Sequence, residues 1–398
     1  MVNKFLYNKG GSESYMFTLA NYLKEMGHGV FYFGMYDKKN EVKKNDYLTT
    51  NVQLHKGGLK SFLRAFSFIY SPEARKKIKG AIKAFKPDII HLNNYNYELT
   101  PSIIYGIKKY RIPIVQTVHD FQMICPHHRL YNFQMRSICE KCAGNKYFQC
   151  ALTKCIGESL PKSLVGTIEA YFYLSLRTYR FIDEFICPSN FMMNRLVGEG
   201  FDKKKITVMH NFTVQVTEKS CEDERYVLYF GRLSEEKGIE ILVKAAKRTP
   251  DVRYVIAGDG PMREILSGIN NIDYRRFLQG EELKDLIKKS SFTVLPSEWY
   301  ENCSMSILES FSSGKPVIAS IIGGNTELVN DGINGLLFYA GNDEQLTEKI
   351  EYLYNNPSVI EKFSIECIKK AKELSIENYY SKLMDIYKKC LLNESERR

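Results

Sequence analysis

The sequence lacks the features of several whole classes of protein. It has one tryptophan and 12 prolines in 398 residues, and no stretch approaches the roughly 18 consecutive apolar residues of a membrane-spanning helix. Its first residues contain no apolar core and no small-residue cleavage site, so we expect no secretory signal. It has no solenoid-type repeat and no low-complexity tract. With 44% hydrophobic and 26% charged residues, the chain is globular rather than disordered or collagen-like. We expect a cytoplasmic protein, with peripheral attachment to the inner face of the membrane as an option.

Acidic residues are scarce in the first half of the chain. Residues 1–200 hold 28 Lys and Arg against 15 Asp and Glu, whereas the remaining residues hold 28 against 31. The excess is densest in segment 60–86, where eight basic residues and one acid, Glu73, alternate with apolar and aromatic residues. An anionic membrane surface, a solvated helix face and nucleic acid are the three interpretations. The apolar content favours the membrane surface, and nucleic acid is the least favoured partner.

Short apolar runs alternate with helical periodicity, which is typical of α/β domains with parallel sheets. The length suits two such domains of about 150–200 residues each. We expect domains at 1–211 and 224–376, a linker at 212–223 and a C-terminal helix at 377–398 that returns to the first domain. The expected strands are 30–35, 89–92, 114–119, 185–188, 226–230, 252–257, 292–296 and 316–320. Ligands of open α/β sheets bind at the carboxyl ends of the strands, which predicts a cleft between the domains.

A turn rich in charge follows the strand expected at 226–230. Gly231 permits close approach of the backbone, and Arg232 and Lys237 place two cations five residues apart. A guanidinium fork and a lysine point charge together favour a diphosphate. A solvated loop is the alternative interpretation of this turn.

A second motif lies in residues 296–316. Ser304 is expected to be the N-cap of a helix that ends near Gly314. The helix N-terminus would offer free N–H groups and the positive end of its dipole to an anion. Glu301 precedes this helix and Glu309 lies within it, so two carboxylates flank the anion position. The pattern favours an elongated ligand with hydroxyls at both ends, such as a nucleotide sugar.

These motifs together resemble the retaining glycosyltransferases of group 1, also called family 4. The matching elements are Glu301 and Glu309 with seven residues between them, the turn from Gly231 to Lys237, and four short motifs: Gly258-Asp259-Gly260, residues 322–327, Gly10-Gly11-Ser12-Glu13 and Val118-His119-Asp120. The resemblance implies the GT-B fold, with two Rossmann-like domains facing across a cleft. It also implies transfer of a sugar, with retention of configuration, from a nucleotide diphosphate sugar to a glycan or lipid-linked acceptor in surface polysaccharide synthesis.

The resemblance implies a role for each matching residue. Arg232 and Lys237 would hold the donor diphosphate, Glu301 the transferred sugar and Glu309 the ribose, while His119 would face the sugar from the other domain. The further expected donor contacts are Gly10, Gly11, Gly231, Asn302, Cys303 and Ser304. We expect no metal to be required for catalysis, because cations and a helix N-terminus supply the positive field. An epimerase or hydrolase of the same fold and a catalytically silent nucleotide-sugar-binding protein are the alternatives.

Two features depart from the family pattern. Relatives usually have Phe-Gly after the first glutamate motif, whereas this chain has Asn302-Cys303-Ser304, which leaves the identity of the sugar open. Only Met1, Val2 and Asn3 stand ahead of the residues leading into the glycine loop. We therefore expect most of a central strand to be missing.

Cysteines cluster in an insert at about 125–155. The spacing of Cys139, Cys142, Cys150 and Cys155 suits a structural zinc site of four thiolates. Buried reduced thiols and an iron–sulfur cluster are the alternatives. Because the insert follows His119, it is expected to flank the mouth of the cleft and to shape the acceptor site.

Overall fold

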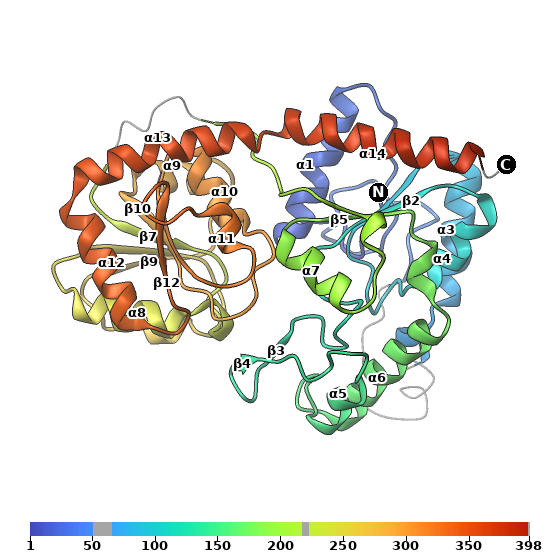
Figure 1. Cartoon of the computed structure of the whole chain (residues 1–398), viewed down its shortest axis with the longest axis horizontal. Helices are drawn as coiled ribbons and strands as arrows, with labels where there is room; N and C mark the ends of the chain where they lie inside the picture. Colours follow the sequence, from blue (N-terminus) through green and yellow to red (C-terminus); the bar gives the residue numbers. More distant parts are fainter. Residues whose placement is uncertain (51–65, 217–222, 397–398) are drawn as a thin grey trace.

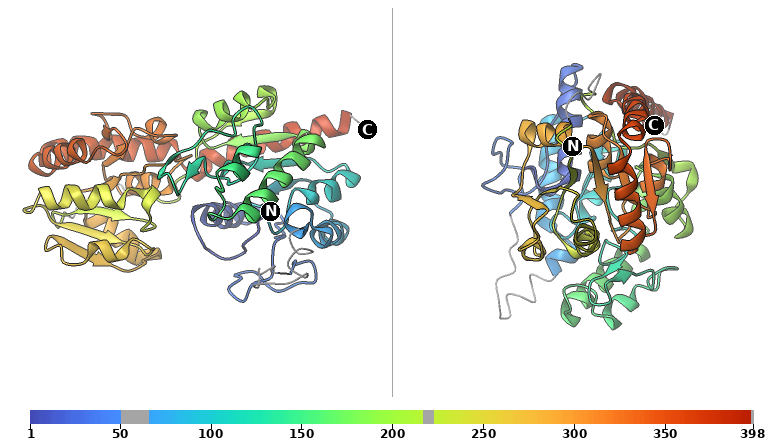
Figure 2. Two further views of the ribbon diagram at one scale, coloured as in Figure 1. Left: turned by 90° about the horizontal axis from the view of Figure 1, so that it is seen from below. Right: turned by 90° about the vertical axis from the view of Figure 1, so that its left-hand side faces the viewer.

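The computed structural model describes residues 1–50, 66–216 and 223–396. Figure 1 shows two α/β lobes side by side, with the helices α13 (Pro357–Glu373) and α14 (Ile376–Glu396) running along one edge of both. The view from below in Figure 2 shows the same two lobes along the long axis of the molecule. The expected α/β class with two doubly wound domains is confirmed. Part of the expected linker, residues 217–222, lies outside the described residues.

The N-terminal lobe contains a parallel sheet of four strands in the order β1-β2-β5-β6. The strands are β1 (Ile90–Leu92), β2 (Ile114–Thr117), β5 (Glu184–Cys187) and β6 (Ile206–Val208). The first three were expected from their apolar runs, and all their residues are buried, as parallel sheets covered on both faces require. Strand β6 was missed because its three residues are only partly buried and carry little periodicity.

The strand expected at 30–35 is wrong. This segment forms only isolated bridges, in which Val2 pairs in parallel with both Phe33 and Leu92, and Met35 pairs with Thr49. Val2 therefore occupies the central position between two neighbours, and its N–H donates to the carbonyl of His91 at 2.8 Å. The short central strand was expected, and its shortness leaves the segment 30–35 without a long partner.

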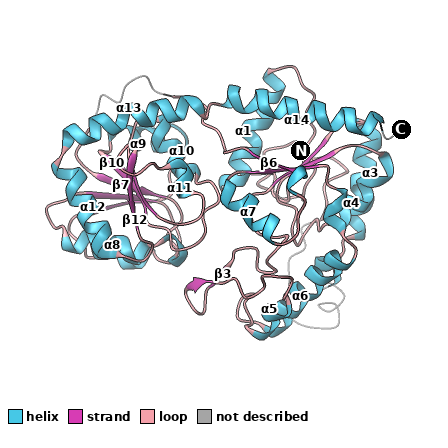
Figure 3. Cartoon of the chain, in the orientation of Figure 1, coloured by secondary structure: helices cyan, strands magenta, loops and turns pink. Residues whose placement is uncertain are grey.

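The helices of the N-terminal lobe are α1 (Gly11–Glu25), α3 (Pro72–Phe85), α4 (Ser102–Ile107), α5 (Phe148–Leu152), α6 (Leu160–Ser175) and α7 (Asn190–Gly198). In Figure 3, helices α1, α3, α4 and α7 lie around the sheet of the N-terminal lobe, and α5 and α6 lie at the end of the lobe away from it. The short antiparallel strands β3 (Tyr131–Asn132) and β4 (Ser137–Ile138) form a hairpin within the cysteine-rich insert.

The C-terminal lobe contains a parallel sheet in the order β12-β11-β10-β7-β8-β9. Its strands are β7 (Val227–Phe230), β8 (Tyr254–Ala257), β9 (Ile272–Arg275), β10 (Phe292–Leu295), β11 (Val317–Ser320) and β12 (Gly335–Phe338). Its helices are α8 (Ile239–Arg248), α9 (Gly280–Lys289), α10 (Met305–Ser312), α11 (Asn325–Leu328) and α12 (Asp343–Asn355). The four expected strands are confirmed, whereas the outer strands β9 and β12 were not anticipated.

Helix α14 packs against the N-terminal lobe, as expected. Its residues Tyr379 and Leu383 share a hydrophobic core with Tyr15 and Met16 of α1. The hydroxyl of Tyr387 hydrogen-bonds Nδ1 of His91 at 2.6 Å. The last helix therefore ties the end of the chain to the first lobe. Across the described ranges, no helix combines the length and apolar character that crossing a membrane requires.

Candidate active site

A cavity of about 690 Å³ lies between the two lobes. Of the residues singled out in the sequence, it is lined by Gly11, His119, Arg232, Lys237, Glu301, Asn302, Cys303 and Ser304. His119 follows β2, Arg232 follows β7 and Glu301 follows β10. Because the carboxyl ends of parallel strands meet at one edge of each sheet, the two edges face one another across this cavity. Gly10 and Gly231 do not line it.

Lys237 and Glu301 form the closest charged contact of the cavity. Nζ of Lys237 lies 2.6 Å from Oε1 of Glu301, which also accepts hydrogen bonds from Oγ of Ser297 at 2.6 Å and Nε1 of Trp299 at 3.0 Å. Burial by itself would raise the pKa of the Glu301 carboxyl, but Lys237 and the two other donors outweigh it and hold the pKa below its ordinary value. Glu301 is therefore an oriented carboxylate at neutral pH.

Sequence reasoning missed Ser297 and Trp299. Trp299 is the only tryptophan of the chain and stands two residues before Glu301, which was the available signal. Nζ of Lys237 lies 5.0 Å from the centroid of its ring, and the guanidinium of Arg129 lies 5.9 Å from the same ring. The indole of Trp299 therefore lies near one cation from each lobe, Lys237 and Arg129.

His119 is held in one orientation and one charge state. Its Nε2 lies 2.9 Å from Oδ1 of Asn93, and its ring meets the ring of Tyr15 edge-on. Asn93 directs its amide nitrogen to the carbonyl of Val2, so its oxygen faces the imidazole and Nε2 carries the proton. Burial lowers the pKa of His119 to about 3. The neutral imidazole then leaves Nδ1 as a hydrogen-bond acceptor.

Glu309 lines a different cavity from Glu301. This second cavity, of about 380 Å³, is bordered by Glu309, Thr213, Gly280 and Lys284, and Met305 borders both cavities. Met305 is the first residue of α10, so the start of this helix lies between the two carboxylates. Burial raises the pKa of Glu309 to about 7.

Ser304 is the N-cap of α10, as expected, but its side chain accepts no hydrogen bond from the first turn. The first N–H groups of this helix are therefore not capped by that hydroxyl. A free helix N-terminus facing a cavity favours binding of an anion.

Asn302 and Cys303 connect the two lobes. Nδ2 of Asn302 donates to the carbonyl of Val118 at 2.7 Å, and its Oδ1 accepts from Oγ of Ser189 at 2.8 Å. Nδ2 of Asn211 donates to the carbonyl of Cys303 at 3.2 Å. The departure from the Phe-Gly pattern thus supplies side-chain contacts across the cleft.

The lack of a side chain at Gly324 lets the backbone of Asn302 lie directly against this turn. A Cβ atom at Gly324 would stand 1.9 Å from the carbonyl oxygen of Asn302. Any residue with a side chain at position 324 would displace the loop that carries Asn302.

The wall of the cavity contributed by the N-terminal lobe includes residues that the sequence analysis did not single out. Tyr97 and His128 stack with ring centroids 4.4 Å apart, and both have positive φ angles, of 61° and 67°. Such backbone conformations cost energy and are typical of functional sites. Lys4, Lys9 and Arg129 add three cations to this wall.

The cysteine-rich insert crosses the mouth of the cleft, as expected. Arg136 of the β3–β4 hairpin lies 3.3 Å from both Glu235 and Glu240 of the C-terminal lobe. Glu140 accepts a hydrogen bond from the hydroxyl of Tyr300 at 2.5 Å. The insert therefore contacts the turn that carries Lys237 and the loop that carries Glu301.

The expected four-thiolate zinc arrangement is not observed. In the described parts of the chain, no group of three or more His, Cys, Asp or Glu side chains is arranged to hold a metal ion. Sγ of Cys150 and Sγ of Cys155 lie 2.8 Å apart, and Cys142 and Cys150 pack with Tyr147 in a small apolar cluster. Burial raises the pKa of the Cys142 thiol to about 12, whereas the hydrogen bond with Cys150 lowers the pKa of Cys155. None of the four thiols, those of Cys139, Cys142, Cys150 and Cys155, forms a disulfide bond.

The basic segment 60–86 is only partly described, because residues 60–65 lie outside the described ranges. In α3, the apolar residues Ala74, Ile78, Ala81 and Ile82 are buried. Their side chains face the core and are unavailable to lipid. The aromatic side chains of Phe66 and Phe85 in the same segment are exposed, so membrane contact through this segment stays a prediction.

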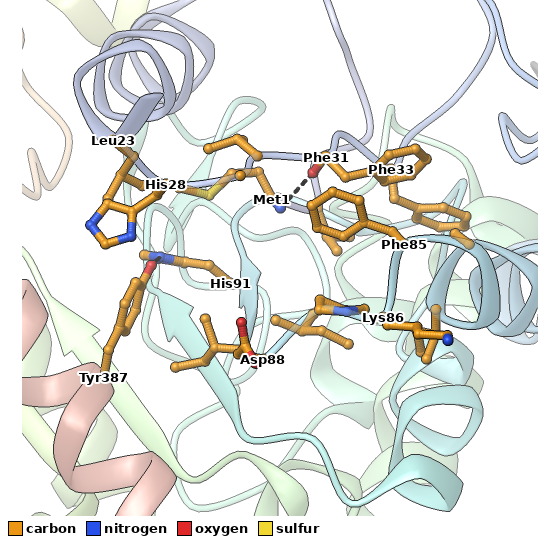
Figure 4. Close-up of a pocket in the computed structure, with 18 of the residues that line it drawn as sticks. Met1, Leu23, His28, Phe31, Phe33, Phe85, Lys86, Asp88, His91 and Tyr387 are labelled. Atoms are coloured by element: carbon orange, nitrogen blue, oxygen red, sulfur yellow. Dashed lines mark hydrogen bonds between the residues drawn. The ribbon is translucent and has the colours of Figure 1, made fainter. Parts of the chain in front are cut away.

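A third cavity, of about 480 Å³, lies at the opposite end of the N-terminal sheet from His119 and contains none of the expected site residues. Figure 4 shows Phe31, Phe33 and Phe85 on one side of it, with Met1, His91 and Tyr387 also in its lining. The amino group of Met1 donates to the carbonyl of Phe31 at 2.9 Å. The cavity continues the line of the short central strand at Val2.

Comparison with known proteins identifies similar chains over both lobes. The profile described as glycosyl transferases group 1 matches residues 214–374, and that described as glycosyltransferase family 4 matches residues 9–146. An uncharacterized glycosyltransferase of Methanocaldococcus jannaschii is 27% identical over 324 residues, which are 76% of this chain and 78% of that protein.

Solved structures share the fold. The Anabaena protein HepE in complex with UDP aligns with a TM-score of 0.65 at 15% identity over 98% of both chains. Sucrose-phosphate synthase from Thermosynechococcus elongatus aligns with a TM-score of 0.69 at 16% identity over 98% of this chain and 96% of that one. The two lobes and the cleft between them are thus those of GT-B proteins.

Proposed function

Because the chain belongs to the group 1 glycosyltransferases, we propose that it transfers a sugar from a nucleotide diphosphate sugar to a glycan or lipid-linked acceptor with retention of configuration. The observation that carries the proposal is the meeting of Arg232, Lys237, Glu301 and His119 in one cavity between the lobes. Two cations, one fixed carboxylate and one neutral imidazole match a diphosphate joined to a sugar.

The donor is proposed to lie along the start of α10. Arg232, Lys237 and the uncapped helix N-terminus would hold the diphosphate. Glu309, in the adjoining cavity, would accept hydrogen bonds from the ribose, and Glu301 would accept them from the transferred sugar. The solved structure of Anabaena HepE with UDP-glucose supports testing uridine diphosphate sugars first.

The proposed reaction replaces one bond on a single face of the sugar. The bond from the anomeric carbon to the β-phosphate oxygen breaks while the bond to the acceptor oxygen forms on the same face. The departing phosphate oxygen takes the acceptor proton, and Arg232 and Lys237 stabilise the negative charge that it gains. Nδ1 of His119 would accept a hydrogen bond from a sugar hydroxyl.

The other carboxylates of the cavity support this front-face route. Besides Glu301, the cavity is lined by Glu13 and Asp120. Glu13 accepts a hydrogen bond from Asn3, and Asp120 accepts from Asn96 and from the N–H of Gln122. Burial raises the pKa of Asp120, which disfavours the ionised form that the attacking nucleophile of a double displacement requires.

The acceptor is proposed to lie against Tyr97, Arg129, Lys4 and Lys9. This wall combines aromatic rings with cations, which suits a sugar that carries or neighbours an anionic group. We propose surface polysaccharide synthesis as the setting, with a cytoplasmic location.

A panel of UDP-, GDP- and ADP-sugars measured by thermal shift tests the donor. A bound donor is expected to raise the melting temperature by mass action, and Arg232→Ala should reduce the shift. Incubation of the preferred donor without acceptor, followed by product analysis, tests the alternatives. An epimerase would convert the sugar, a hydrolase would release it, and a silent binding protein would leave it unchanged even with acceptors. Stabilisation by none of the nucleotide sugars would refute the proposal.

A further inference from the structure

Helix α6 has its apolar side outward. Leu160, Leu164, Ile168 and Tyr171 recur at helical spacing, and all four are exposed. The buried residues of the same helix are instead small or polar in the main: Ser163, Gly166, Thr167, Glu169 and Tyr173. A helix on a water-facing surface normally shows the reverse pattern.

Helix α5 extends this apolar face. Phe148 is 46% exposed and Leu152 is 71% exposed, and α5 packs directly against α6. We name the six side chains Phe148, Leu152, Leu160, Leu164, Ile168 and Tyr171 the α5–α6 apolar surface. Residues 148–171 thus hold six of the 24 large exposed hydrophobic side chains in the described part of the chain. Such a concentration marks an interaction surface.

Basic residues border the α5–α6 apolar surface. Lys146, Lys154 and Lys162 are exposed, and Glu158 is the one exposed acid between residues 146 and 171. Glu169 is buried. None of the three lysines forms an ion pair with another residue of the described ranges. An apolar surface with a cationic border is complementary to an anionic bilayer, where the side chains enter the acyl boundary and the ammonium groups meet headgroups.

A second copy of this chain would fit the surface poorly. A two-fold contact would place the same patch of each copy against the other. The lysines of one copy would then face those of its partner, and like charges brought together disfavour association. An anionic lipid surface attracts the same lysines.

The position of α5 and α6 connects this surface with the cleft. Figure 1 shows both helices at the end of the N-terminal lobe remote from α1 and α14, on the side where the β3–β4 hairpin lies. Ile156, between α5 and α6, lines the cavity that holds His119 and Glu301. A bilayer under the α5–α6 apolar surface would therefore lie next to the acceptor end of the cleft.

We infer that the α5–α6 apolar surface, with its bordering lysines, is the site at which this protein binds an anionic lipid bilayer. This assigns membrane contact to a different element from the basic segment 60–86, whose helix α3 buries Ala74, Ile78, Ala81 and Ile82 in the core. The surface lies outside the proposed donor site, so the inference can fail while the proposed function stands.

Co-sedimentation with lipid vesicles tests the inference. The intact chain is mixed with vesicles of phosphatidylcholine alone or of phosphatidylcholine with phosphatidylglycerol. We expect binding to the anionic vesicles that weakens in high salt. Leu164→Ser with Ile168→Ser should reduce this binding by about tenfold or more. Lys154→Gln with Lys162→Gln should reduce it only on anionic vesicles.

Matched variants distinguish this surface from general stickiness. Ile365 and Ile333 are also exposed but belong to the C-terminal lobe, so Ile365→Ser with Ile333→Ser should bind vesicles like the wild type. The melting temperature and its shift with the preferred donor report in every variant whether the fold and the donor site persist. Absence of wild-type binding to anionic vesicles would overturn the inference. So would undiminished binding by Leu164→Ser with Ile168→Ser, or loss of a dimer in that variant without loss of vesicle binding.

Discussion

Nζ of Lys237 lies 2.6 Å from Oε1 of Glu301. The cation proposed to hold phosphate is thus paired with the carboxylate proposed to hold the sugar. Both side chains are largely buried, with exposures of 20% and 9%. Donor binding must therefore share Lys237 between Glu301 and phosphate, and loss of either residue affects stability as well as transfer.

Replacement of Lys237 by alanine is expected to destabilise the fold and to abolish transfer. Glu301 would remain as a buried carboxylate without its cation, which typically costs about 3–5 kcal/mol, and its pKa would rise. Urea unfolding at neutral pH measures this loss. The double variant Lys237→Ala with Glu301→Gln is the control and should recover most of the stability, because it leaves no buried charge. Equal stability of the single and double variants would contradict the pairing.

Replacement of Asp120 by asparagine distinguishes the two routes to retention. On the front-face route Asp120 is not a nucleophile, so Asp120→Asn should keep measurable transfer and give the same anomer. A double displacement through Asp120 would instead lose transfer by several orders of magnitude. Single-turnover rates with analysis of the product anomer provide the measurement. Glu301→Gln, measured beside it, should show the larger loss of transfer.

Donor affinity is expected to fall as the pH drops below about 7. Burial raises the pKa of Glu309 to about 7, and its carboxylate form accepts hydrogen bonds from the ribose hydroxyls more strongly than the protonated form. The Kd for UDP should therefore rise as the pH falls through about 7 and level off at the value for the protonated form. Isothermal titration between pH 5.5 and 8.5 measures the effect.

The variant Glu309→Gln is the control for this pH dependence. With this variant the UDP phosphate, whose own pKa lies near 6, still takes up a proton as the pH falls. Position 309, however, has no carboxyl group to titrate. Its Kd should be higher at pH 8 and should change less with pH than that of the wild type. Parallel profiles for the two proteins would remove Glu309 from the ribose site.

The amino group of Met1 is expected to make stability rise with pH. Burial lowers its pKa from 8.0 to about 5, so between pH 5 and pH 8 the unfolded chain binds more protons than the folded one. Stability attributable to this group is then complete above pH 8 and declines as the pH falls toward 5, by at most about 4 kcal/mol. Urea unfolding at a series of pH values measures the slope.

A chain extended by a few apolar residues ahead of Met1 is the comparison for this slope. The extension would replace the amino group by a peptide N–H, which does not titrate between pH 5 and pH 8. The extended chain should be more stable and should lack the part of the slope due to Met1. Identical slopes for the two chains would show that the amino group does not titrate in this range.

The sequence alone determined the α/β class, most of the central strands and the main residues of the cleft. Buried parallel strands appear as short apolar runs, and the residues after β7 and β10 carry their chemistry in local motifs such as Gly231-Arg232 and Glu301. Since parallel strands end at one edge, the motifs also predicted their own meeting place. The arrangement of two lobes around a cleft could be predicted without knowledge of individual side-chain contacts.

Only the tertiary structure decided which faces are buried and which partners meet. The segment 30–35 is apolar enough for a strand but has little more than Val2 to pair with. Helices α3 and α6 both contain apolar residues, yet α3 turns them to the core and α6 turns them outward. The cysteine spacing brought Cys142, Cys150 and Cys155 together, and the structure packs them with Tyr147 in an apolar cluster. Asn93 meets His119 across 26 residues of the chain. In each case the deciding contacts join residues far apart in the chain or depend on what packs against a face, which local periodicity does not encode.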